Sequence, residues 1–148
     1  MMRARLPLGA ILVAVVLASC GGRPGLTVSL DGKTVAMVLG STTERTACST
    51  IHGDAFPQNV PVTAIAKTSE VRFEAGSGAT SVRLFIYDVD APPGGPLEEV
   101  TLPARGGTYA PRALTAGHTY EVVANVVWSF VVTGGEETHM FRLRMEPP

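Results

Sequence analysis

The chain has few cysteines, no surplus of basic charge and no apolar run long enough to span a membrane. Two cysteines in 148 residues are too few for the disulfide framework of a small secreted domain, so apolar burial must hold the fold together. The 12 basic and 13 acidic residues give a net charge of −1, which leaves no excess to neutralise phosphates, and nucleic acid is not expected as a partner. The longest apolar run, residues 6–17, is shorter than the about 20 residues that a membrane-spanning helix requires.

The first 20 residues have the layout of an export signal. Arg3 and Arg5 precede the apolar run, and small residues at positions 18 and 19 precede Cys20. A positive segment, an apolar segment and then small residues are typical of a secretory signal. The last four of these residues, LASC, resemble the lipobox of bacterial lipoproteins. An uncleaved anchor and an ordinary cleaved signal are the alternatives.

The resemblance to lipoproteins implies a place in the cell. Residues 1–19 would be a signal peptide, helical where it is ordered, and residues 20–25 a short lipidated tether. Cys20 would carry a diacylglyceryl group, and several acyl chains together anchor a protein stably where one does not. The protein would then face outside the cytoplasm on the cell membrane or the outer membrane, and Gly21 in place of an aspartate favours the outer membrane in a two-membrane cell. Cys48 would be the one remaining thiol.

The rest of the chain, residues 26–148, is predicted to be an all-β domain. Residues 120–130 alternate, so that every second side chain is apolar and shares one face of a strand. Residues 141–145 alternate apolar with basic side chains, which is typical of an antiparallel strand with one wet face. We expect a hairpin between these two strands with its turn at residues 133–136. The side chains assigned to the buried face are Tyr120, Val122, Ala124, Val126, Trp128, Phe130, Phe141, Leu143 and Met145.

A second hairpin is predicted at the start of the domain. Residues 26–30 and 33–39 flank Asp31 and Gly32, a pair suited to a two-residue turn with positive φ. The register places two apolar pairs on one face: Val28 opposite Val35, and Leu26 opposite Met37.

Between the hairpins, short runs rich in apolar and β-branched residues predict further strands. They cover residues 60–66, 70–75, 81–88, 98–102 and 109–114. The run at 81–88 is apolar on both faces, which predicts a central strand. The fold class expected is an antiparallel β-sandwich with an added N-terminal hairpin.

Residues 114–120, LTAGHTY, resemble the corner of immunoglobulin-like and fibronectin type III domains. In those families a tyrosine opens the penultimate strand and its hydroxyl bonds back to the preceding turn; here that residue is Tyr120. The resemblance implies an immunoglobulin-like core over residues 58–148, preceded by a hairpin and loop over residues 26–57. The chain lacks the paired cysteines of antibody domains, and Trp128 lies on the penultimate strand.

Few side chains suggest a metal or catalytic site. Cys48 stands four residues from His52, which would suit a nucleophile pair or a soft metal, although a small buried cysteine beside a loop histidine is commoner. His118 and His139 complete a weak, scattered set of copper ligands. Asp88 and Asp90 could bind calcium or act as acid and base, but a charged strand end entering a proline-rich loop is the plainer reading. No catalytic residue, metal or cofactor is therefore expected.

The function expected is that of a non-catalytic interaction module that is held to the membrane through Cys20 and binds an envelope protein. Binding would use loops, which a sandwich presents at its ends; the candidates are residues 40–57, 91–96 and 133–138. Two alternatives stay open. One is a peptidase inhibitor of immunoglobulin-like type, by fold analogy alone, and the other is a copper-handling protein.

Overall fold

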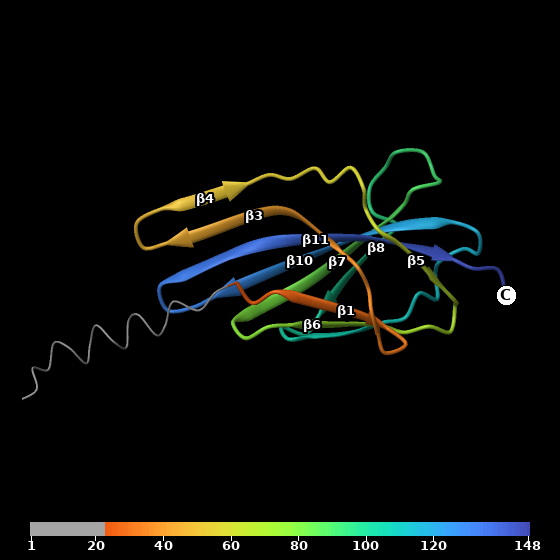
Figure 1. Ribbon diagram of the computed structural model, residues 1–148, viewed down its shortest axis with the longest axis horizontal. Helices are drawn as coiled ribbons and strands as arrows, with labels where there is room; N and C mark the ends of the chain where they lie inside the picture. The colour runs from red at the N-terminus through yellow and green to blue at the C-terminus, as the bar shows by residue number, and fades with distance from the viewer. Residues whose placement is uncertain (1–22) are drawn as a thin grey trace, which may run out of the picture.

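A computed structural model describes residues 23–148, which form strands and loops without a helix. The expected signal segment and Cys20 lie outside these residues. The strands form two sheets packed face to face, so the prediction of an all-β sandwich is confirmed (Figure 1). Among residues 23–148, no helix is long and apolar enough to span a bilayer.

The smaller sheet has four strands in the order β2–β1–β6–β9. Its strands are β1 (Leu26–Leu30), β2 (Lys33–Thr34), β6 (Val71–Ala75) and β9 (Gly106–Tyr109). The larger sheet has seven strands, six of them in the order β4–β3–β11–β10–β7–β8, and β5 joins β11 in parallel. Its strands are β3 (Val38–Thr46), β4 (Thr50–Gly53), β5 (Val62–Ile65), β7 (Ala79–Asp88), β8 (Glu98–Leu102), β10 (Thr119–Ser129) and β11 (Thr133–Met145). All other strand pairs are antiparallel.

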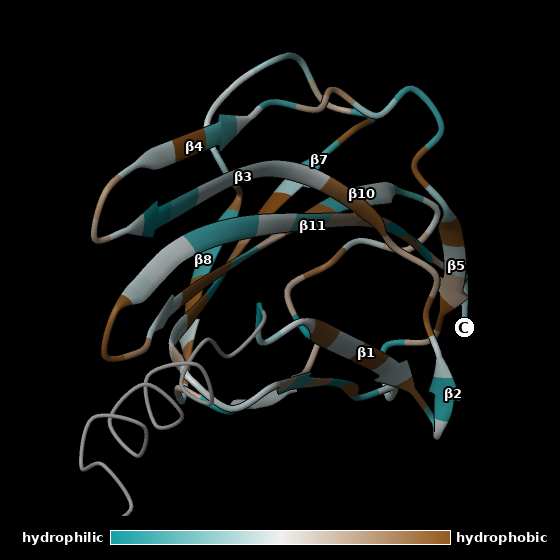
Figure 2. Cartoon of the chain, turned by 60° about the vertical axis from the view of Figure 1, so that its left-hand side comes forward, coloured by the Kyte–Doolittle hydropathy of each residue, from teal (hydrophilic) through white to brown (hydrophobic). Residues whose placement is uncertain are grey.

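The core lies between the two sheets, which face each other in Figure 2. Alternate side chains of most strands are buried there, while β2 and β4 contribute none. The rings of Phe73 in the smaller sheet and Phe141 in the larger are 6.1 Å apart and tilted by 42°, an arrangement that aromatic pairs prefer. β7 lies between β10 and β8, which confirms the predicted central strand. The side chains of β7, β10 and β11 with no exposed surface are Val82, Leu84, Ile86, Val122, Ala124, Val126, Phe141, Leu143 and Met145.

The C-terminal hairpin forms as predicted, but its turn lies earlier in the chain. Ser129 pairs with Gly134, and the N–H of Phe130 donates to the carbonyl of Thr133 at 2.7 Å. Residues 133–138 are therefore strand, and the prediction of a turn at 133–136 is wrong. Gly135 lies opposite Trp128, and a Cβ there would clash with the carbonyl oxygen of Thr43 on β3 and come within 2.8 Å of the indole ring. The glycine makes room for both neighbours, a role that sequence alone does not separate from a turn.

The N-terminal hairpin is shorter than predicted. Its turn is at Asp31 and Gly32, both with positive φ, and the N–H of Val35 donates to the carbonyl of Val28 at 2.8 Å. β2 ends at Thr34, however, and Leu26 pairs with Ala75 of β6 instead of Met37. The chain leaves this sheet after β2 because the segment from Val38 onward pairs with β11 in the other sheet.

Two further predictions fail for related reasons. Residues 40–57, expected as a loop, contain most of β3 and all of β4, because these segments extend the larger sheet beyond β11. The strand expected at 109–114 lies at Gly106–Tyr109 instead. Pro111 has no N–H to donate to a sheet, which is consistent with the strand ending before it.

The corner before β10 is closed by Tyr120, which is 1% exposed. Its hydroxyl accepts a hydrogen bond from the N–H of Thr115 at 2.8 Å, the bond that the sequence predicted. Gly117, with φ of +84°, donates its N–H to the carbonyl of Met145. The turn is thereby tied both to the start of β10 and to the end of β11.

Replacement of Tyr120 by phenylalanine should lower the free energy of unfolding by about 1 kcal/mol, because the ring stays in the core and only the hydrogen bond is lost. Denaturant unfolding followed by circular dichroism measures this. Tyr87→Phe is the control, since within residues 23–148 its hydroxyl makes no hydrogen bond to another side chain. Equal stability of Tyr120→Phe and the control would show that the corner bond contributes nothing.

Candidate functional site

The connections between strands gather at two opposite ends of the sandwich. We call the end where the described chain begins the entry end; it contains residues 23–25, 47–49, 76–78, 103–105 and 130–132. The opposite, far end contains residues 31–32, 66–70, 89–97 and 110–118. Residues 54–61 run along the edge of the larger sheet, between β4 and β5. The three loops predicted for binding are therefore divided. Only residues 91–96 are an exposed loop, at the far end.

A cluster of polar side chains closes the far end. His118, just before β10, donates from Nδ1 to Oδ2 of Asp88, the last residue of β7, at 2.8 Å. The second Asp88 oxygen accepts the N–H of Asp90 at 2.9 Å, and Oδ2 of Asp90 accepts the N–H of Thr119 at 2.7 Å. The His118 ring also stacks on Tyr120 with centroids 6.3 Å apart. These contacts join the end of β7 to the start of β10.

The Asp88 carboxyl is only 17% exposed. Burial raises its pKa, but the hydrogen bond from His118, the N–H groups of Asp90 and Ala91 and the charge of His118 outweigh burial, so the pKa lies below the ordinary value of 3.8. Asp88 is therefore a carboxylate held by its neighbours, which is the state of a structural partner and not of a general acid.

Asp88, Asp90 and His118 have possible metal-ligating atoms within 4.8 Å of one another, and no other group of three or more does so among residues 23–148. Carboxylate oxygens and an imidazole suit a divalent metal. Both oxygens of Asp88 and one of Asp90 already accept hydrogen bonds from the protein, however. The geometry accounts for the cluster as a hydrogen-bonded latch between two strands.

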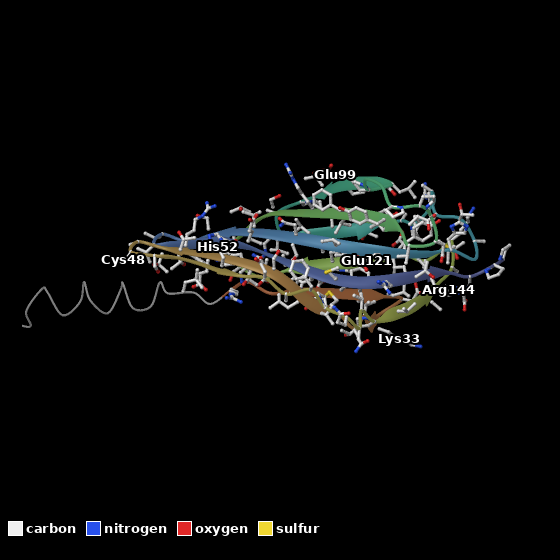
Figure 3. All side chains as sticks on the ribbon, turned by 90° about the horizontal axis from the view of Figure 1, so that it is seen from above. Lys33, Cys48, His52, Glu99, Glu121 and Arg144 are labelled. Carbon is white, nitrogen blue, oxygen red and sulfur yellow. The ribbon has the colours of Figure 1, made fainter. Side chains whose placement is uncertain are left out.

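The four metal candidates from the sequence lie on separate elements. Cys48 is exposed at the turn between β3 and β4, at one end of the molecule (Figure 3), so the commoner reading of a buried cysteine is wrong. His52 contacts the hydroxyl of Thr43 through Nδ1 at 3.1 Å. His118 and His139 have carboxylate partners of their own. Among the described residues, no two of these four candidates belong to the same group of three possible ligands.

A buried acid and imidazole pair was missed by the sequence analysis. Oε1 of Glu137 lies 2.9 Å from Nε2 of His139, and their side chains are 4% and 13% exposed. They face Val126 and Ala124 of β10, on the same side of the sheet as Phe141. Extending the apolar alternation of β11 backwards by two residues at a time reaches both positions, so the signal was present. The misplaced turn concealed it.

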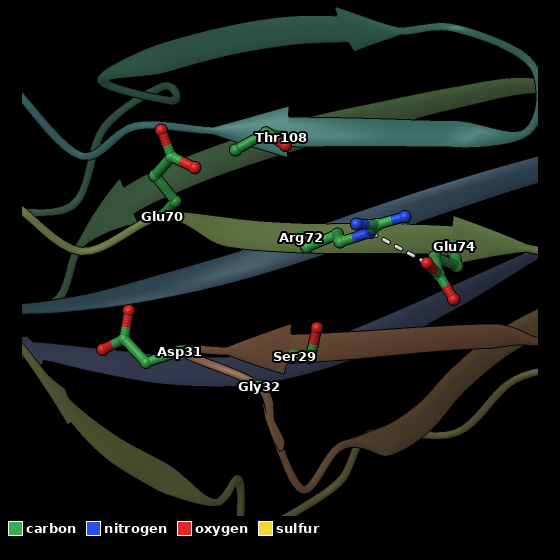
Figure 4. Close-up of a pocket in the computed structure, with 7 residues that line it drawn as sticks. All are labelled: Ser29, Asp31, Gly32, Glu70, Arg72, Glu74 and Thr108. Atoms are coloured by element: carbon green, nitrogen blue, oxygen red, sulfur yellow. Dashed lines mark ion pairs between the residues drawn. The ribbon is translucent and has the colours of Figure 1, made fainter.

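The outer face of the smaller sheet has a shallow depression that is polar (Figure 4). Asp31 and Glu70 lie at one side of it, and Arg72 pairs with Glu74 at 2.8 Å at the other. Both paired side chains are more than half exposed, so the ion pair contributes little to stability. Small-molecule sites are mostly apolar and deeply concave, whereas this surface is polar and shallow.

The outer face of the larger sheet carries a row of half-buried apolar side chains. Phe85, Val123, Met140 and Val38 are cross-strand neighbours on β7, β10, β11 and β3. Next to this row Arg142 donates to Oε2 of Glu121 from Nε at 3.0 Å and from Nη2 at 2.9 Å. We call the four apolar residues the outer row.

The proline-rich loop at the far end lies beyond the outer row along β7 and β10. Tyr87 is the cross-strand neighbour of Glu121, and both border a hollow beneath residues 91–96 that Leu97 also lines. Apolar side chains that are rimmed by an ion pair and a loop are typical of a protein interaction surface. This face is the best candidate site on the described chain.

Comparisons of the whole sequence with protein families, curated proteins and solved structures find no match.

Asp88→Asn should destabilise the protein in a pH-dependent way. The pKa of Asp88 is lower in the folded than in the unfolded chain, so its stabilising effect is complete above about pH 4 and is lost as the pH falls through the folded-state pKa. The difference in unfolding free energy between wild type and variant should therefore shrink in acid, as measured by urea unfolding across that range. Glu99→Gln, an exposed carboxyl on β8, should show no such trend. A difference that is constant with pH would contradict the latch.

His139→Ala should lower the unfolding free energy by about 3 kcal/mol, because it leaves the Glu137 carboxyl buried without its partner. The double variant Glu137→Leu/His139→Ala removes the unpaired group and should recover part of this loss. Thermal and urea unfolding of both variants measure the effect. If the double variant is no more stable than His139→Ala, the loss of unfolding free energy comes from packing alone.

Proposed function

We propose that this chain is a lipid-anchored extracytoplasmic lipoprotein whose immunoglobulin-like sandwich is a non-catalytic module that binds an envelope protein. The observation that carries the binding role is the outer row, a continuous apolar strip across four strands that faces solvent. Non-obligate interfaces combine such apolar centres with polar rims. The Glu121–Arg142 pair and the loop at 91–96 supply that rim.

The anchor is supported by the sequence of the leader. A basic start, an apolar run too short to span a bilayer and the LASC ending at Cys20 fit export followed by lipidation. The immunoglobulin-like connectivity is supported by the Tyr120 corner bond, which is typical of that class of sandwich. Neither support depends on the outer row, so the two parts of the proposal can be tested apart.

The anchor is tested by the intact mass of the exported full chain. The expected mass is that of residues 20–148 plus a diacylglyceryl group, with or without an N-terminal acyl chain. Cys20→Ala should retain the leader and lose the lipid. A wild-type mass with a bare Cys20 would overturn the anchor.

The binding surface is tested by placing a photo-crosslinking amino acid at Val123, within the outer row, in the full chain expressed in its own envelope. We expect a discrete adduct there and none from Thr108, an exposed position on the outer face of the smaller sheet. Phe85→Asp introduced beside the probe should abolish the adduct, because an aspartate cannot be buried without a partner. Equal adducts from both faces, or an adduct that survives Phe85→Asp, would count against the outer row.

A further inference from the structure

The two ends of the sandwich differ in charge. The five segments of the entry end contain Arg23 and Arg105 and no acidic residue. Of the charged side chains that flank these segments, Arg45 and Glu74 each lie two residues away, and Glu44 pairs with Arg23. The far-end segments carry more acidic than basic side chains. The charged and titratable residues in those segments are Asp31, Glu70, Asp90, Lys67, Arg112 and His118.

The entry end also exposes apolar side chains at a hairpin tip. Val131 is 91% exposed and Val132 is 36% exposed, and neither belongs to the core. The tip of the neighbouring β3–β4 hairpin adjoins them, since Ala47 and Val131 border the same shallow hollow. Figure 1 shows both hairpins projecting at this end of the molecule.

The described chain begins at the same end and is fixed there. The carbonyl of Gly25 accepts the N–H of Gly76 at 3.2 Å, and Arg23 pairs with Glu44 at 3.4 Å. Cys20 lies three residues before Arg23, and three residues span at most about 11 Å. A lipid on Cys20 would therefore place the entry end, and no other part of the domain, against the bilayer surface.

We propose that the entry end is a second membrane contact, with Val131 and Val132 inserted into the lipid interface and Arg45 and Arg105 against anionic headgroups. This inference rests on the lipidation of Cys20 proposed above. Apolar side chains beside basic ones are the combination that binds interfaces, and acidic residues oppose it. The far end exposes Val89 and Leu97 as well, but among carboxylates. The contact fixes the orientation of the domain, so that the strands stand upright from the membrane and the outer row, which crosses them, runs parallel to the bilayer surface.

The natural thiol offers a test on the complete protein. Cys48 lies exposed at the entry end, and in the lipidated chain it is the only free thiol. The wild-type lipoprotein is labelled there with an environment-sensitive fluorophore and reconstituted into phosphatidylethanolamine–phosphatidylglycerol vesicles that contain lipids with a nitroxide on the upper acyl chain. Cys48→Ser/Leu97→Cys carries the same label at the far end, where Leu97 is 57% exposed. Interfacial segments insert about 5–10 Å, within reach of such a quencher.

We expect quenching of the label at Cys48 and none at Leu97. Val131→Asp/Val132→Asp should reduce the quenching at Cys48 while intact mass and vesicle flotation show that the lipid is still attached. These positions are outside the core, and circular dichroism checks that the variant is folded. Equal quenching at both labels, or quenching that the double aspartate leaves unchanged, overturns the membrane contact and leaves the anchor standing. A protein without lipid on Cys20 overturns both proposals.

Discussion

The structure depends on burial of one face of each sheet against the other, since no disulfide joins the described strands. The exposed Cys48 is the only cysteine in residues 23–148. Full burial of a valine, leucine or phenylalanine side chain contributes about 1.5–3 kcal/mol, and the interior faces of β7, β10 and β11 are lined with such residues. The strict alternation of these strands is therefore the constraint that fixes which faces remain free for other roles. The outer row exists because the same strands that bury one face leave the other to solvent.

Alternation in the sequence predicted the elements that have one wet face. β10 and the second half of β11 were placed by it, as was the central position of β7, which is apolar on both faces. It could not place elements where glycine is ambiguous. Gly134 and Gly135 suit a turn as well as a strand, and alternation does not show that the Thr43 carbonyl and the Trp128 indole leave no room for a side chain at Gly135. It also could not show that β1 would pair with β6 along its whole length, because that partner lies 40 or more residues away in the chain.

The candidate site was less accessible to sequence reasoning than the fold. The loops predicted for binding were chosen because sandwiches often bind through loops, yet two of the three are largely strand. The outer row combines single residues from four strands, and only the register brings Val38, Phe85, Val123 and Met140 side by side. The latch at Asp88 and the Glu137–His139 pair are likewise products of pairing between distant segments. The corner at Tyr120 was expected from the resemblance of residues 114–120 to immunoglobulin-like and fibronectin type III domains, and its hydrogen bond joins residues only five positions apart.

The pairing of β3 with β11 has a consequence for the order of folding. β11 is the last strand of the chain and is also the partner of β3, of β5 and of β10. The larger sheet cannot close until β11 has been made, and sheets built from such distant pairings form slowly. The pairing of β11 with its three partners is therefore expected to be a late step in folding.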